Sequence, residues 1–187
     1  MRGFDIDGRT SASAFSDSIV ISVLVNNNNF NESFSTLITN LSFVGSKLIT
    51  DGILIRGGIT TGKIVHTDDG VVFGQGLIDA YHLEERFAKF PRIILSDKLI
   101  KQLNYPLLTK KDRYPYHQYI RRFEDGCVGF HQIMYFQVFE FWSKMSSLKL
   151  TTGLNKVKET IISGLDSSFE NPDVFEKYVW LKNQYNK

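Results

Sequence analysis

Residues 10–25 constrain the fold more than any other stretch, because they place a charged residue between two runs that favour β-strands. The runs at 10–15 and 18–25 are apolar and rich in β-branched residues, and the short polar sequence around Asp17 separates them. β-Branched residues favour strands, whereas Ser and Asp favour tight turns. The pattern therefore predicts a β-hairpin with Asp17 at or near its tip.

Asp17 itself has two interpretations. An aspartate at a hairpin tip often serves the turn alone, since its side chain bonds to neighbouring backbone groups. A carboxylate held rigidly at a sheet edge can instead bind a divalent cation, because Mg²⁺ prefers hard oxygen ligands. The hairpin sequence alone does not decide between them.

The rest of the chain predicts alternating helices and strands, and this order indicates an α+β fold. We expect a largely antiparallel sheet with helices packed on one face. Pro91 stops one helix, and Ser96 caps the next. After the hairpin we expect a helix at 30–48, then a strand, a glycine-rich bend and a returning strand within 53–67, and a short strand at 71–73. A helix at 76–88, a buried strand at 92–95, a short helix after 97 and a loop at 104–118 should follow. The last expected elements are a hairpin around 125–126, a segment that periodicity leaves as strand or helix, and two C-terminal helices.

Composition excludes several classes of protein. The net charge is +2, from 22 basic and 20 acidic residues, which gives no indication of a nucleic-acid-binding face. Cys127 is the single cysteine, so an internal disulfide is excluded and a reducing, cytoplasmic setting is expected. Its surroundings favour a buried thiol over a nucleophile. No apolar run approaches the roughly 20 residues of a membrane span.

The glycine-rich segment at 56–63 superficially resembles a phosphate-binding P-loop. Four residues separate Gly57 from Gly62, and Lys63 follows. Ile64, however, stands where a P-loop needs a hydroxyl residue for magnesium. We expect instead that the glycines let two strands and a helix approach closely.

A strand-to-helix junction follows at 71–84, in the sequence VVFGQGLIDAYHLE. Gly74 is expected at the turn, and the helix N-terminus would present free N–H groups suited to a phosphate. The alternative is an ordinary strand-to-helix connection. His82, considered alone, is more typical of a surface or packed histidine than of a catalyst.

Taken together, these stretches resemble the class III nucleotidyl cyclases. The similar motifs are AFSDSIVIS, IRGGITTGKIV, VVFGQGLIDAYHLEE and FPRIILSDKL, in the family's order, and they cover about residues 10–100. The nearest subgroup is that of the bacterial uridylate and cytidylate cyclases of anti-phage defence, whose tail the C-terminal FEKYVWLKNQYN loosely resembles. The resemblance implies a ferredoxin-like catalytic domain at 1–148, N-terminally incomplete, and a helical extension at 149–187.

The resemblance also implies a chemistry. Family members hold two Mg²⁺ or Mn²⁺ ions with two aspartates at a homodimer interface. The ribose 3′-hydroxyl attacks the α-phosphate of a nucleoside triphosphate, which gives a 3′,5′-cyclic nucleotide and pyrophosphate. For this subgroup the substrate would be UTP or CTP, and the product would be a second messenger.

Carried over by position, the family's metal ligands and transition-state residues are only partly present. Asp17 matches the second metal aspartate. The first would lie on an upstream strand that is absent, so we expect a truncated or decayed sequence, and Asp5 and Asp7 echo its motif only faintly. His82 falls at the family's arginine position, and Ile78 falls at its asparagine position.

The substrate positions favour a small base. Ser13 and Val71 stand where adenylate cyclases carry the Lys and Asp that select adenine, and Phe15 and Gly74 are the other implied substrate-binding residues. Two hypotheses remain: a pyrimidine nucleotide cyclase, and a cyclase-like protein that binds nucleotide or a partner without turnover. An adenylate or guanylate cyclase is the least favoured.

Overall fold

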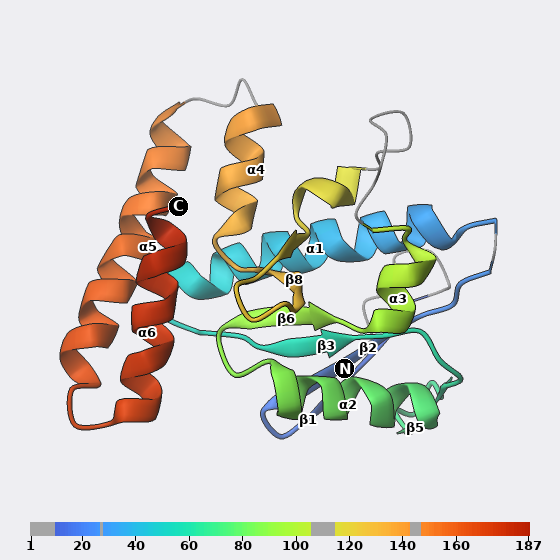
Figure 1. Cartoon of the computed structure of the whole chain (residues 1–187). Helices are drawn as coiled ribbons and strands as arrows, with labels where there is room; N and C mark the ends of the chain where they lie inside the picture. Colours follow the sequence, from blue (N-terminus) through green and yellow to red (C-terminus); the bar gives the residue numbers. More distant parts are fainter. Residues whose placement is uncertain (1–9, 27, 106–114, 143–146) are drawn as a thin grey trace.

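The computed structural model describes residues 10–26, 28–105, 115–142 and 147–187, and the fold is a mixed α+β arrangement (Figure 1). Much of the loop expected at 104–118 lies outside the described residues. In chain order the elements are β1 (Thr10–Phe15), β2 (Ser18–Val23), α1 (Phe30–Thr50), β3 (Gly57–Ile59), β4 (Val65–His66), β5 (Val72–Phe73), α2 (Gln75–Phe87), β6 (Arg92–Leu95), α3 (Asp97–Gln102), the 3₁₀-helix η2 (Pro115–Gln118), β7 (Arg121–Arg122), β8 (Val128–His131), α4 (Met134–Trp142), α5 (Ser147–Ser167) and α6 (Pro172–Tyr185).

Most local predictions are confirmed. The β1–β2 hairpin pairs Phe15 with Ser18 around a two-residue turn. Helix α1 ends before Asp51 and Gly52, as expected, and Gly52 has a left-handed φ of 80°. The Ser96 side chain accepts a hydrogen bond from the Leu99 amide and so caps α3. The segment left undecided after the β7–β8 hairpin is helical, as α4.

The main sheet is largely antiparallel, as expected, but it contains one parallel pairing. Its strand order is β3-β6-β8-β7, with β3 parallel to β6 and the other two pairings antiparallel. The expectation that β4 returns beside β3 is wrong, because β4 pairs with β5 and β3 pairs with β6. The β1–β2 hairpin and the β4–β5 hairpin are separate two-stranded sheets.

Helices cover both faces of the sheet, so the expectation of helices on one face is also wrong. Successive residues of a strand point to opposite faces. In β6, Ile93 packs with the α1 side of the core, whereas Ile94 packs with Leu83 of α2. Figure 1 shows α1 and α2 on opposite sides of β3 and β6.

The two C-terminal helices form an antiparallel pair at one end of the sheet (Figure 1). Their inner face packs on the end of α1 and the start of α4. Thr160 of α5 also donates a hydrogen bond to the Ile49 carbonyl, at 3.0 Å. This second cluster contains Ile49, Ile133, Phe136, Val157, Ile161 and Leu181. No helix within the described ranges is long and apolar enough to cross a membrane.

Candidate functional site

The β1–β2 hairpin holds Asp17 at its tip, as the sequence predicts. Ser16 has a left-handed φ of 54°, which lets two residues reverse the chain. Asp17 is exposed. Among the described residues, no group of three or more His, Cys, Asp or Glu side chains is placed to hold a metal ion. The metal-binding role of Asp17 stays a prediction, and a single carboxylate fits a cation that arrives with a triphosphate.

A histidine joins this hairpin to the β4–β5 hairpin. The Nε2 atom of His66 lies 2.7 Å from Ser13 Oγ, and its Nδ1 atom lies 2.7 Å from Ser22 Oγ. A serine hydroxyl can donate or accept, so both ring nitrogens stay paired whichever one carries the proton. The bridge fixes the two hairpins against each other.

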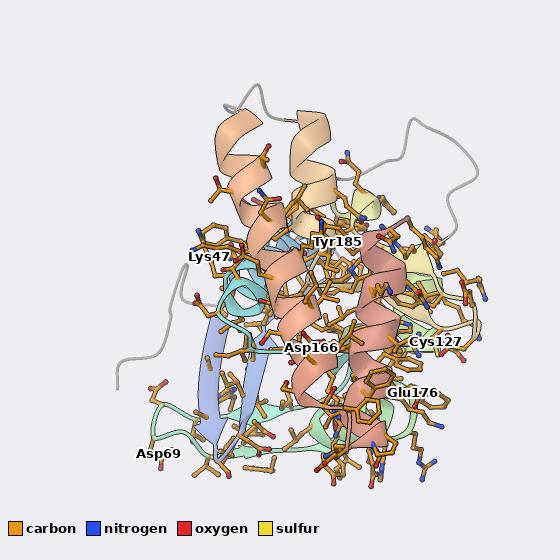
Figure 2. The ribbon with its side chains drawn as sticks, turned by 90° about the vertical axis from the view of Figure 1, so that its left-hand side faces the viewer. Lys47, Asp69, Cys127, Asp166, Glu176 and Tyr185 are labelled. Carbon is orange, nitrogen blue, oxygen red and sulfur yellow. The ribbon has the colours of Figure 1, made fainter. Side chains whose placement is uncertain are left out.

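The turn at 67–71 lies against the same strand. The Thr67 amide donates to the Val71 carbonyl at 2.9 Å, and the Thr67 hydroxyl bonds to the Asp69 carboxylate. This hydroxyl holds the pKa of Asp69 below its ordinary value. A Cβ placed on Gly70 would lie 3.5 Å from Ser13 Oγ. Figure 2 shows the turn that carries Asp69 beside the hairpin.

The structure thus brings two of the predicted substrate residues into one neighbourhood. Val71 follows Gly70, where an added Cβ would reach van der Waals contact with Ser13, and the Val71 side chain is half exposed. Phe15 is 46% exposed and shares a strand face with Ser13, since the two are two residues apart. We call this region the hairpin–turn junction and define it by Ser13, Phe15, Ser22, His66 and residues 67–71.

Close packing explains why position 74 is a glycine. Its φ is 132°, and a Cβ there would lie 2.7 Å from the Lys63 carbonyl oxygen. The chain at 62–64 crosses the start of α2, and the Gly76 amide donates to the same Lys63 oxygen at 2.9 Å. This amide is therefore already paired. The Gly76 N–H group is therefore not free to bind a phosphate at the N-terminus of α2. The substrate role of Gly74 stays a prediction.

His82 lies on an exposed part of α2. Its Nδ1 atom is 3.7 Å from the Glu85 carboxylate, and its ring lies beside that of Tyr81. Both partners belong to its own helix, so these contacts do not link His82 to the hairpin–turn junction. Its catalytic role stays a prediction.

Cys127 is partly buried rather than fully buried. Burial raises the pKa of its thiol, and the nearby Asp125 carboxylate raises it further. A nucleophilic cysteine needs the opposite shift, because the thiolate is the reactive form. The sequence-based preference against a nucleophile agrees with this environment.

His66 is the residue of the junction that sequence reasoning did not single out. The alternating serines at 11 and 13 and the facing Ser22 mark a polar strand face, which is a signal that the face has a polar partner. The partner lies 44 residues beyond Ser22 in the sequence, so no local pattern connects them.

Comparisons of the chain with protein-family models, curated proteins and solved structures found no match. The resemblance to class III cyclases therefore rests on the motifs quoted above.

Proposed function

We propose that the chain binds a pyrimidine nucleoside triphosphate at the hairpin–turn junction, as a relative of the class III cyclases. The observation that carries the proposal is the His66 bridge, which holds the turn at 67–71 beside Ser13. These are the two positions that the resemblance assigns to base selection. Neither Ser13 nor Val71 is charged, which suits a smaller base with fewer polar contacts.

Phe15 supplies a surface for the base in this proposal. Its ring is 46% exposed on the strand face that carries Ser13. Bases stack on aromatic rings with about 1–3 kcal/mol per base. The triphosphate would extend toward the hairpin tip, where Asp17 can contact a cation that the triphosphate brings with it.

We take binding without turnover as the first form of the function, because Ile78 and His82 stand where the family carries its transition-state asparagine and arginine. The second candidate is cyclisation of UTP or CTP as an anti-phage signal, with Mg²⁺ or Mn²⁺ in a homodimer. This candidate is favoured by the β1–β2 hairpin, because the family motif also carries its metal-binding aspartate on a hairpin. Asp5 and Asp7 lie outside the described residues.

The test is equilibrium binding of UTP, CTP, ATP and GTP to the full chain, each with Mn²⁺. We expect tighter binding of UTP or CTP than of either purine. Phe15→Ala should weaken pyrimidine binding about tenfold, as the loss of one stacked base predicts. Phe43→Ala should leave it unchanged, because Phe43 is an equally exposed phenylalanine on α1. Equal binding of all four nucleotides, or binding of none, would contradict the proposal.

The same samples separate binding from turnover. Mass spectrometry of the reaction mixtures detects a cyclic nucleotide, and a coupled assay detects pyrophosphate. If a product forms with wild type and with Asp51→Asn but is lost with Asp17→Asn, cyclisation replaces simple binding as the function. Asp51 is a suitable control because it is an exposed aspartate at the end of α1.

A further inference from the structure

The α5–α6 pair is apolar on two sides. Its inner side packs on the core through residues such as Val157 and Leu181, which are fully buried. Apolar side chains are also exposed on the outer side: Ile162 of α5 is 49% exposed, and Phe169, in the turn after α5, is 82% exposed. A surface helix normally has one apolar face, so a second one indicates a second packing partner.

The outer side is hollowed between the two helices. A groove of about 420 Å³ lies there. Residues 162, 165 and 166 share one side of α5, residue 169 lies in the turn after it, and residues 175, 179, 182 and 183 follow helical spacing along α6. Figure 2 faces this side, with Asp166 lying between the two helices. The groove is lined by Leu165, Asp166, Phe169, Phe175, Val179, Lys182 and Asn183.

The groove carries one charge of each sign. Asp166 lines it from α5, and Lys182 lines it from α6. Neither side chain forms an ion pair with another of the described residues in the salt bridges of this structure. A partner that carries a cation and an anion beside an apolar centre would complement both of these exposed charges.

We propose that this outer groove is the interface with a second copy of the chain. The exposed Phe169 ring stands on the turn that joins α5 to α6, and the groove lies beside it between the two helices. A two-fold axis would place each Phe169 ring in the groove of the other copy, because a two-fold interface uses the same patch twice. The same operation brings Asp166 of each copy toward Lys182 of the other. The inference is independent of the nucleotide proposal, since it uses a different surface.

A second copy fits this surface better than a small ligand does. A ligand in the groove would contact only the side of the 82% exposed Phe169 ring that lines it, and would leave the half-exposed Ile162 in water. A second helix pair covers the groove, the ring and Ile162 together. Aromatic residues are also enriched at the centres of protein interfaces, where they contribute much of the binding energy.

The experiment is sedimentation equilibrium of the full chain over a range of concentrations. We expect a wild-type dimer. Phe169→Ser should raise the dissociation constant at least tenfold, and Phe87→Ser should not change it. Phe87 is a matched control because it is a half-exposed phenylalanine on α2. Circular dichroism verifies that each variant is folded.

Charge reversal gives a second test that does not depend on truncating an aromatic residue. Asp166→Lys alone and Lys182→Asp alone should each weaken the dimer, since each places like charges across the two-fold axis. The double variant should restore it. A monomeric wild type would overturn the proposal. So would a dimer that survives Phe169→Ser but is lost in Ile19→Ser, which changes a residue 71% exposed on the β1–β2 hairpin.

Discussion

The guanidinium carbon of Arg92 lies 5.8 Å from the ring centroid of Trp180, so the central sheet and the last helix meet at a buried cation–π contact. Phe90 and Phe123 place their rings 5.4 and 4.7 Å from the same carbon. The Arg92 side chain is only 2% exposed, and it forms an ion pair with Asp125. It also donates to the Phe87 carbonyl at 3.1 Å. One arginine thus joins β6, the α2 terminus, the β7–β8 turn and α6.

Replacing Arg92 should loosen this junction. Arg92→Met keeps much of the apolar stem but removes the ion pair and the hydrogen bond to the Phe87 carbonyl. We expect a loss of about 2 kcal/mol in the free energy of unfolding. This loss is smaller than for a fully buried ion pair, because Asp125 is 44% exposed and water can solvate its carboxylate. Urea denaturation measures it. Arg122→Met is the matched control, and it should stay within about 0.5 kcal/mol of wild type because Arg122 is exposed.

A histidine beside this junction should make the fold sensitive to acid. His131 is 1% exposed and packs between Phe123 and Trp180. Burial holds the pKa of His131 well below its ordinary value, and the positive charges of Arg121 and Lys187 lower that pKa further. In the unfolded chain it titrates near pH 6.5. Below that pH the unfolded chain binds a proton that the folded chain does not, so stability falls as pH falls.

The expected slope is at most about 1.4 kcal/mol per pH unit below pH 6.5. Urea denaturation at intervals from pH 7.5 to pH 5 measures it. His131→Phe should flatten the curve over this window, since an uncharged ring takes the place of the buried imidazole. His82→Phe changes an exposed histidine and should leave the slope as in wild type. An unchanged slope in His131→Phe would show that other groups cause the acid sensitivity.

Local sequence patterns predicted the elements well, because local physics determines them. Helical spacing, the Asp-Gly end of α1 and the Ser96 cap each act within a few residues. The layer arrangement was missed, although the run RIIL carries a signal for it. All of its residues, 92–95, are buried. A strand with no solvent-facing side lies between two covered faces, which α1 and α2 provide here.

The long-range polar contacts could not be read from the sequence. His66 bridges serines 53 and 44 residues away, and nothing near it indicates which strand face it meets. Asp17 illustrates the reverse case. Its position at the hairpin tip follows from the local pattern, but its role depends on groups that the fold must bring to it.

Gln132 makes three long-range hydrogen bonds with a single side chain. Its amide nitrogen donates to the Gly45 and Ile53 carbonyls at 2.9 and 3.0 Å, and its amide oxygen accepts from the Ile55 amide at 2.9 Å. The side chain is 3% exposed, so water cannot readily replace these bonds. One glutamine therefore joins α1 and the segment leading to β3 with the end of β8.

Gln132→Met should leave three backbone groups without their partner. We expect a loss of about 3 kcal/mol in the free energy of unfolding, since each unsatisfied buried group costs about 1–3 kcal/mol and relaxation recovers part of the sum. Thermal and urea denaturation measure it. Gln102→Met, at an exposed position in α3, makes the same chemical change and should alter stability by less than about 0.5 kcal/mol. Equal effects at both positions would contradict the bracing role.

The adjacent glycines of β3 should respond differently to the same substitution. A Cβ on Gly57 would meet Ile93 Cγ1 at 3.7 Å, which is an ordinary contact, whereas one on Gly58 would lie 2.6 Å from the Ala80 carbonyl oxygen and 3.1 Å from the Glu84 amide nitrogen. Gly58 faces α2, and both close atoms are backbone, so they cannot move aside as a side chain could. Gly58→Ala must push α2 off the sheet, with an expected loss of about 2–3 kcal/mol.

Gly57→Ala is the control that the chain itself provides. It adds the same methyl group one residue away, on the α1 face, and its effect should lie between neutral and a gain of about 1 kcal/mol, because alanine restricts the unfolded chain. The two variants are compared by urea denaturation under the same conditions. Similar losses would mean that strand pairing limits both positions. A loss confined to Gly58→Ala would confirm that the second glycine of this segment serves the close approach of a helix to a strand.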